Sequence, residues 1–492
     1  MENKLPFYPD KVWKRFYRLT QIPRPSGKEE RIRQYTAGFG SSLGLETIVD
    51  SAGNVLVRKP ATPGMEHLKG VILQSHLDMV PQKNSGRIHD FECDPIETVA
   101  DGEWVRANGT TLGADNGIGV AAALAVLESD DLVHGPLEAL FTANEEAGMS
   151  GARGLAPGLL KGTVLLNLDS EEEGELFIGC AGGVDAKITF PFSEKRLSGD
   201  YKGFTIQVTG LKGGHSGMDI NLGRGNANKI MNRLLYHGSR SFGLQLASLK
   251  GGSLRNAIAR ESFAHVAIPS NHADAFADML SVAALKIKNV YRTTDPGLKI
   301  EIVTANIPEK VIEQRISERM LNAVYAFPDG VMRMSSDMAG LVETSNNLAV
   351  VVSGEGSIVI ECLLRSSVEF ESENLQTMIG SISDLAGAVS VFDHGYPGWK
   401  PNIDSPVLKT MREVYERKFG KSPHVTAVHA GLECGILGGT YPGLDMISFG
   451  PTIRYPHSPD EKVHIGSVGR FWDFLVETLG HIPSGQGLRT ED

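Results

Sequence analysis

Cysteine is scarce in this sequence, and long apolar runs are missing. The chain has 4 cysteines among its 492 residues, and no two of them form a Cys-x-x-Cys pair. This spacing indicates neither a disulfide framework nor a cysteine zinc site, so a reducing compartment is expected. No apolar run approaches the roughly 18 residues that a membrane span needs, and the first residues lack the basic and apolar regions of a signal peptide. We therefore expect a cytoplasmic protein without a membrane partner.

The sequence also lacks an excess of basic residues. Its 48 lysines and arginines against 59 aspartates and glutamates give a formal net charge of −11. A basic surface for nucleic acid or anionic lipid is therefore not expected. Hydrophobic residues make up 41% and charged residues 22%, a composition typical of globular proteins, and the length predicts two or three domains. Some of the many carboxylates are available as ligands rather than as solvated surface.

Short apolar runs that end in polar residues give the first indication of the fold. These runs are typical of buried strands, and they cover residues 70–78, 137–146, 164–169 and 446–449. Between the first two, Asp115-Asn116 precedes the apolar stretch 117–127, which predicts a helix. Strands that alternate with helices predict an α/β sheet. Such sheets bind ligands beyond the carboxyl ends of their strands, which is where these polar residues lie.

The middle of the chain has a different character. Residues 187–395 contain glycine-rich loops and two segments, around 226–239 and 272–291, with the spacing of amphipathic helices. We interpret this stretch as a second domain that is inserted into the first. Residues 1–186 and 396–492 would then be the two parts of the first domain.

Two aspartates have both a chemical and a structural explanation. His76 and Asp78 end a predicted strand, where residues i and i+2 point to the same face, so Asp78 can accept a hydrogen bond from the imidazole of His76. A buried structural pair is the alternative. Asp115 precedes a predicted helix, for which an N-cap is the simpler interpretation. Neither motif alone decides between a metal ligand and a structural residue.

The adjacent carboxylates Glu145 and Glu146 are more informative. Like charges at the end of an apolar strand repel each other unless a cation lies nearby, although a solvated acidic turn is the alternative. Asp169 closes another strand, and we expect the acidic run 170–173 after it to be solvated surface. Oxygen and imidazole ligands from separate strands suit a hydrolytic site with two metal ions. Five residues fit such a site: His76, Asp115, Glu146, Asp169 and His457, the last in a proline-containing loop.

The same residues, in this order, carry a resemblance to a known family. The motifs are His76-Leu77-Asp78, Gly113-Ala114-Asp115-Asn116-Gly117, Glu145-Glu146, Asp169 and His457. Over essentially the whole chain, the sequence resembles the M20 family of metallopeptidases. Further stretches resemble the branch of this family that cleaves aminoacyl-histidine dipeptides, at residues 213–217, 251–258, 396–399 and 429–435.

The resemblance implies a fold and a metal site. The first domain would be an α/β domain with a mixed, mostly parallel sheet flanked by helices, and residues 187–395 would be an α+β lid. Each subunit would bind two divalent ions, zinc first, with manganese or cobalt as alternatives. Asp115 would bridge the ions, and the other ligands would divide between them, His76 and Asp169 on one, Glu146 and His457 on the other. Glu145 would be the general base for the water between the ions, and Asp78 would orient His76.

The resemblance also implies substrate-binding residues in the lid. His215 resembles the lid histidine that, in dimers of this family, reaches the partner's active site and polarises the substrate carbonyl. Asn256 and Arg365 resemble residues that hold the carbonyl group and the C-terminal carboxylate of the substrate. As isolated residues, all three would be structural. His429 and Glu433 are lower-ranked candidates for the pocket. The implied partners are a small peptide and a second copy of the chain.

The implied function is hydrolysis of the peptide bond of unblocked dipeptides, including Xaa-His dipeptides such as carnosine. Two alternatives stay open: an N-acyl-amino-acid deacylase of the same family, and a non-catalytic binding protein on the same fold. Glu145 disfavours the binding protein, because a site without turnover needs no general base.

Overall fold

The computed structural model describes residues 5–485, and these residues fall into two units. The first unit contains the described residues up to Gly179, together with Pro401–Ala427 and the described residues from Leu432 onward. The second unit contains Cys180–Lys400 and the short segment Val428–Gly431. Between residues 5 and 485, no helix has both the length and the apolar character that a membrane span requires.

An eight-stranded mixed sheet forms the centre of the first unit. Its order is β1 (Glu46–Val49), β2 (Val55–Lys59), β6 (Leu137–Thr142), β3 (Val71–His76), β7 (Val164–Asn167), β21 (Asp445–Ser448), β8 (Glu175–Cys180) and β20 (His424–Val428). Strands β6, β3, β7 and β21 are the four that the apolar runs predicted, and they run parallel. Antiparallel pairs lie on both sides of them. Strands β3, β6 and β7 are buried at every residue, as expected for parallel strands covered on both faces.

Helices and a second, smaller sheet complete the first unit. The helices are α1 (Asp10–Thr20), α2 (Glu30–Ser42), α3 (Ala114–Glu128), α4 (Ser150–Gly154), α9 (Pro406–Phe419), α10 (Glu433–Thr440) and α11 (Ile465–Leu479). The predicted helix over 117–127 lies within α3, which is buried along almost its whole length and packs on α1 and β3. The smaller sheet is antiparallel, with the order β22 (Ile453–Arg454), β23 (Lys462–His464), β5 (Trp104–Ala107) and β4 (Thr98–Asp101).

The second unit is built on a long antiparallel sheet. Its order is β14 (Lys299–Ala305), β11 (Tyr201–Thr209), β13 (Ser262–Pro269), β12 (Gln245–Gly251), β17 (Val342–Gly354), β18 (Ser357–Ser366), β9 (Gly182–Pro191) and β19 (Val389–Tyr396), with β16 (Gly330–Met334) beside β17. A two-stranded ribbon joins β10 (Glu194–Arg196) to β15 (Lys310–Ile312). The sequence placed the domain boundaries at residues 187 and 395, which lie inside strands β9 and β19.

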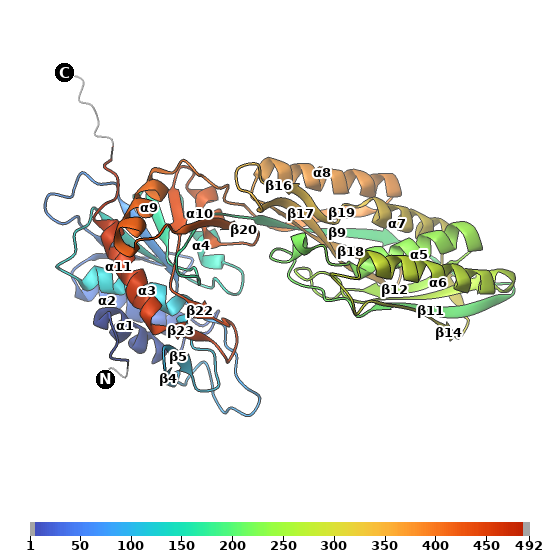
Figure 1. Ribbon diagram of the computed structural model, residues 1–492, viewed down its shortest axis with the longest axis horizontal. Helices are drawn as coiled ribbons and strands as arrows, with labels where there is room; N and C mark the ends of the chain where they lie inside the picture. Colours follow the sequence, from blue (N-terminus) through green and yellow to red (C-terminus); the bar gives the residue numbers. More distant parts are fainter. Residues whose placement is uncertain (1–4, 486–492) are drawn as a thin grey trace, which may run out of the picture. The chain divides into compact units, whose positions relative to one another are not determined.

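Four helices cover one face of this long sheet (Figure 1). They are α5 (Ala227–Phe242), α6 (Ala273–Val290), α7 (Gln314–Ala326) and α8 (Glu369–Ala386), and short 3₁₀ turns lie at Ile220–Leu222 and Ser270–His272. Helices α5 and α6 confirm the two amphipathic segments of the sequence. The apolar side of α5, including Met231 and Leu235, packs into the buried core of the unit. Its N-cap, Asn226, accepts hydrogen bonds from the first N–H groups of the helix.

Lys229 joins two of these helices through main-chain contacts. Its side chain lies on α5, and its ammonium group donates hydrogen bonds to the carbonyl oxygens of Val324 (2.7 Å), Tyr325 (3.2 Å) and Phe327 (2.8 Å) at the end of α7. The last carbonyl groups of a helix have no partner within the helix and carry its negative dipole end. The ammonium group therefore supplies hydrogen-bond donors to the last carbonyl groups of α7 and fixes this helix against α5.

We expect Lys229→Met to lower the free energy of unfolding by about 1–3 kcal/mol, because methionine keeps the apolar stem but leaves these carbonyl groups without a donor. Urea unfolding of the parent and the variant measures the difference. Lys288→Met is the matched control, since Lys288 is exposed on α6 and has no side-chain hydrogen bond or ion pair within residues 5–485. An equal unfolding midpoint for the two variants would contradict the role of Lys229.

Candidate active site

The predicted ligands of the first unit lie together at one end of its sheet. His76 is the last residue of β3, and the others follow strands or begin a helix: Glu145 and Glu146 after β6, Asp169 after β7, Asp115 at the start of α3, and His457 between β22 and β23. Parallel strands end at the same edge of a sheet, which brings His76, Glu145, Glu146 and Asp169 together. Asp115 and His457 reach this edge from a helix start and from a loop of the smaller sheet.

Asp115 lies at the centre of this cluster, with one histidine at each carboxylate oxygen. Its Oδ1 is 3.0 Å from Nε2 of His76, and its Oδ2 is 3.1 Å from Nε2 of His457. A second carboxylate faces each of these nitrogens, since Asp169 Oδ1 is 3.3 Å from His76 and Glu146 Oε1 is 2.9 Å from His457. Each imidazole nitrogen thus faces two carboxylate oxygens, which a single N–H group cannot both satisfy.

The N-cap interpretation of Asp115 is wrong. Helix α3 begins after Gly113, which has a left-handed backbone, and both Asp115 and Asn116 have non-helical dihedral angles. The side chain of Asp115 faces the two histidines instead of the helix. The N–H groups of residues 112–115 donate to Glu461, a buried residue that no motif indicated.

Asp78 connects His76 to the segment that carries the paired glutamates. Its Oδ1 lies 3.4 Å from Nδ1 of His76 and accepts the N–H of Glu145 (2.9 Å), while Oδ2 accepts the N–H of Glu146 (3.1 Å) and the hydroxyl of Ser26 (2.8 Å). Burial raises the pKa of Asp78, but His76, Ser26 and the N–H of Glu145 outweigh it and lower this pKa to about 2. Asp78 is therefore a fixed negative charge.

The pKa values of the cluster reflect crowded negative charge. Hydrogen bonds to Asp115 and Glu146 raise the pKa of His457 to about 11. Burial raises the pKa of Asp169 to about 6 although His76 opposes this shift. Burial also raises the pKa of Glu145 well above its usual range, with His76 opposing and Asp169 adding to the shift. The site accordingly favours bound protons or bound cations.

A buried cation and a further buried acid lie beneath the cluster. Arg24 is 2% exposed, and its guanidinium donates to the carbonyl oxygens of Leu77 and Asp78. Glu433, the first residue of α10, accepts hydrogen bonds from Gln74 Nε2 (2.6 Å) and Thr142 Oγ1 (2.7 Å). Burial raises its pKa to about 7. The sequence analysis gave Glu433 as a lower-ranked candidate and did not predict Arg24. The position of Arg24 between two prolines is the sequence feature that could have indicated a fixed side chain there.

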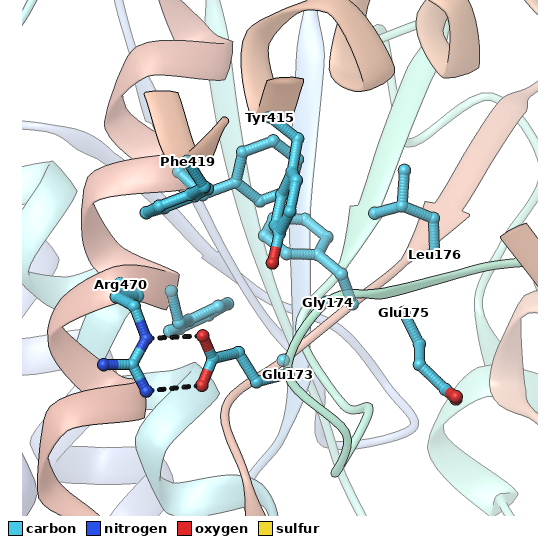
Figure 2. A pocket seen from close by; sticks show the side chains of 11 residues that line it. Glu173, Gly174, Glu175, Leu176, Tyr415, Phe419 and Arg470 are labelled. Carbon is cyan, nitrogen blue, oxygen red and sulfur yellow. Dashed lines mark hydrogen bonds and ion pairs between the residues drawn. The ribbon is translucent and has the colours of Figure 1, made fainter. Parts of the chain in front are cut away.

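The acidic run after Asp169 was expected to be solvated surface, which is wrong for two of its residues. Burial raises the pKa of Glu171 to about 8, and the charges of Asp115 and Asp169 add to this shift, which places Glu171 at the edge of the site. Glu173 forms a two-bond pair with Arg470 of α11, with distances of 2.5 and 2.6 Å (Figure 2).

The three predicted substrate residues belong to the second unit, where they lie together. The main chain pairs His215 with the residue after Asn256, and the N–H of Ser216 donates to the carbonyl of Asn256 (2.8 Å). Arg365 is 5% exposed, and its guanidinium donates to the hydroxyl groups of Ser216 (3.3 Å) and Tyr396 (3.2 Å). Among residues 5–485 Arg365 has no carboxylate partner, so its charge stays available to an anion.

Main-chain contacts fix the proton of His215. Its Nδ1 accepts the N–H groups of Gly217 (3.2 Å) and Met218 (3.1 Å), so the ring hydrogen lies on Nε2. Burial and the nearby Arg365 lower the pKa of His215, which keeps the ring neutral. His429 is also buried in this unit and lies 2.7 Å from Ser345 Oγ. His215 is thus a neutral hydrogen-bond donor through Nε2.

Comparison with known proteins gives the family. Residues 72–481 match Peptidase family M20/M25/M40. The chain is 44% identical over 476 residues to the cytosol non-specific dipeptidase of Escherichia coli (strain K12). The aligned region covers 97% of this chain and 98% of that protein. The crystal structure of aminoacylhistidine dipeptidase from Vibrio alginolyticus superposes with a TM-score of 0.93 at 45% identity, over 97% and 98% of the two chains. A Staphylococcus aureus tripeptidase with 16% identity shares the fold, with a TM-score of 0.55 over 97% and 99% of the chains. This chain therefore belongs to peptidase family M20/M25/M40.

Proposed function

We propose that this chain is a metal-dependent dipeptidase that hydrolyses the peptide bond of unblocked dipeptides, including Xaa-His dipeptides such as carnosine. The observation that carries this proposal is the arrangement around Asp115: each of its two oxygens faces one histidine, and each of these histidines faces one further carboxylate. The 44% identity to the E. coli dipeptidase over nearly the whole chain supports the substrate class.

The residues around Asp115 fit two divalent ions. One ligand atom from each of His76, Asp115 and Glu146 lies within 4.8 Å of the others, close enough for these three residues to bind one ion. Each histidine nitrogen carries at most one proton but faces two carboxylate oxygens. A cation between the nitrogen and these oxygens would bind to all three atoms. His76 and Asp169 would hold one ion and Glu146 and His457 the other, with Asp115 shared. Imidazole and carboxylate ligands suit zinc, with manganese or cobalt as alternatives. When bound, such ions lower the pKa of water and polarise a carbonyl group.

Glu145 is proposed as the general base. Its carboxyl group would take the proton of the attacking water and deliver it to the leaving amine. Burial raises its pKa, which suits a group that both takes and returns a proton. Asp78 holds the main chain of Glu145 and Glu146 through two hydrogen bonds and faces the imidazole of His76. One carboxylate therefore positions the base and two ligands.

Residues of the second unit are proposed to bind the substrate. Arg365 would hold the C-terminal carboxylate, because a guanidinium without a carboxylate partner can form two parallel hydrogen bonds with it. His215 would donate from Nε2 to the substrate carbonyl oxygen, and Asn256 would hold the same group. The family resemblance favours a homodimer, and the name of the E. coli relative favours a location in the cytosol.

The substrate class has a direct test. We expect the purified protein, supplied in turn with zinc, manganese or cobalt, to hydrolyse β-alanyl-histidine and other unblocked dipeptides. N-acetyl amino acids serve as the comparison, because a deacylase of the same family would prefer them. If only the acetylated compounds are cleaved, the dipeptidase proposal is wrong and the protein is a deacylase. If dipeptides bind but are not hydrolysed, the protein is the non-catalytic binding protein.

Variants of Asp115 and Glu145 distinguish a role in metal binding from a role in catalysis. We expect Asp115→Asn to lose bound metal, because an amide supplies only one oxygen to a position that two ions share. Glu145→Gln should keep both ions and lose about 10²–10⁴-fold in kcat, the usual contribution of a general base. Elemental analysis of the dialysed proteins beside dipeptide kinetics measures both effects. Full activity in Glu145→Gln would show that another residue is the base.

Arg365→Lys tests carboxylate recognition. Lysine keeps the charge but not the two-bond geometry, so kcat/KM for a free dipeptide should fall about 10–100-fold, equivalent to roughly 1.5–3 kcal/mol. The dipeptide amide, which lacks the carboxylate, should be affected much less. Arg333→Lys is the control, since Arg333 lies on an exposed strand and pairs with Glu343 and Glu371. Equal losses for dipeptide and amide would exclude the assigned contact.

A further inference from the structure

Glu461 is a buried carboxylate that binds the main chain beside Asp115. The residue is 2% exposed. Its Oε2 accepts hydrogen bonds from the N–H groups of Leu112 (2.8 Å) and Gly113 (3.0 Å), and its Oε1 from those of Ala114 (2.7 Å) and Asp115 (3.2 Å). Four consecutive N–H groups before the helical part of α3 thus point at one carboxylate, an arrangement in which main-chain N–H groups bind anions.

Arg24 holds the same segment from its carbonyl side. Its Nη2 donates to the carbonyl of Gly113, while Nη1 donates to the carbonyls of Leu77 and Asp78. Gly113 has a φ of +72°, and a Cβ at this position would lie 2.5 Å from Nη2 of Arg24. The left-handed backbone and this close contact both favour glycine here. The segment before Asp115 is fixed by a buried anion through its N–H groups and by a buried cation through a carbonyl group.

Glu461 also belongs to the segment that carries His457. It follows His457 by four residues, its N–H donates to the carbonyl of Ser458 (3.0 Å), and β23 begins at the next residue, Lys462. Strand β23 pairs with β5, which anchors this end of the loop in the smaller sheet. One side chain therefore connects the two segments whose ligands, Asp115 and His457, face each other at 3.1 Å.

We propose that Glu461 is a positioning residue that holds Asp115 and His457 at the separation needed to bind divalent ions. The inference rests on the proposed function, because it gives the residue a role in that metal site. Glutamine at this position would keep one oxygen but turn an amide NH₂ group toward two of the four N–H groups. Those groups would lose their acceptor, and the segment before Asp115 would shift.

The test compares E461Q with the parent protein and with D460N. Asp460 is exposed, and its side chain has no hydrogen bond or ion pair in the described part of the chain, so D460N removes the same charge one residue away. Metal-free protein is titrated with Zn²⁺ and Co²⁺ against a chromophoric chelator, and the visible spectrum of the Co²⁺ form reports ligand geometry. We expect about 10–100-fold weaker binding of metal by E461Q and an altered Co²⁺ spectrum, with D460N equal to the parent.

Unchanged metal affinity and an unchanged Co²⁺ spectrum in E461Q would overturn the positioning role, whatever its melting temperature. If E461Q does not fold, E461D takes its place, because aspartate keeps the charge but withdraws the carboxylate by one methylene. Parent-like metal binding in a folded E461D would then overturn the proposal, and weaker binding would support it. A parent protein that binds no divalent ion would instead refute the proposed function, so the two failures are distinguishable.

Discussion

Repulsion among buried carboxylates is the constraint on which the first unit depends. Parallel strands bring Glu145, Glu146 and Asp169 to one edge of the sheet, where Asp115 at the start of α3 joins them and Glu433 lies close by. Two unit charges about 4 Å apart interact by about 4 kcal/mol at an effective dielectric constant of about 20. Several such pairs would exceed the stability of an ordinary domain, roughly 5–15 kcal/mol. Bound protons or bound cations must therefore offset part of this repulsion.

Main-chain N–H groups offset the charges of two further carboxylates that lie beside this cluster. Asp78 accepts the N–H groups of Glu145 and Glu146, and Glu461 accepts those of four residues in succession. These dipoles are fixed by the fold, so they need no rearrangement when charge in the site changes. Glu461 accepts the N–H groups just before the helical part of α3, and both oxygens of Asp115 face histidines. A carboxylate that capped the helix could not do so.

The sequence predicted the parts of this site that depend on local pattern. An apolar run that ends in a polar residue identifies a strand and its carboxyl end, which placed His76 and Asp169 correctly. Arg24 and Glu461 left no such pattern, because their partners are main-chain groups that any residue carries. Glu461 contacts the chain 346–349 residues before it. The segment Val428–Gly431, which belongs to the second unit, was missed for a related reason, since four residues are too few to carry a periodicity.

The two units hold buried charges of opposite sign that the described protein does not neutralise. In the first unit, carboxylates outnumber the cations near them, and the raised pKa values of Asp169 and Glu145 express this excess. In the second unit, Arg365 is buried against two hydroxyl groups and no carboxylate. Burying an unpaired charge is unfavourable in free energy. Each site therefore stays charged most readily when a ligand of opposite charge binds there. Under the proposed function, divalent cations would meet that need in the first unit, and the carboxylate of a small peptide would meet it in the second.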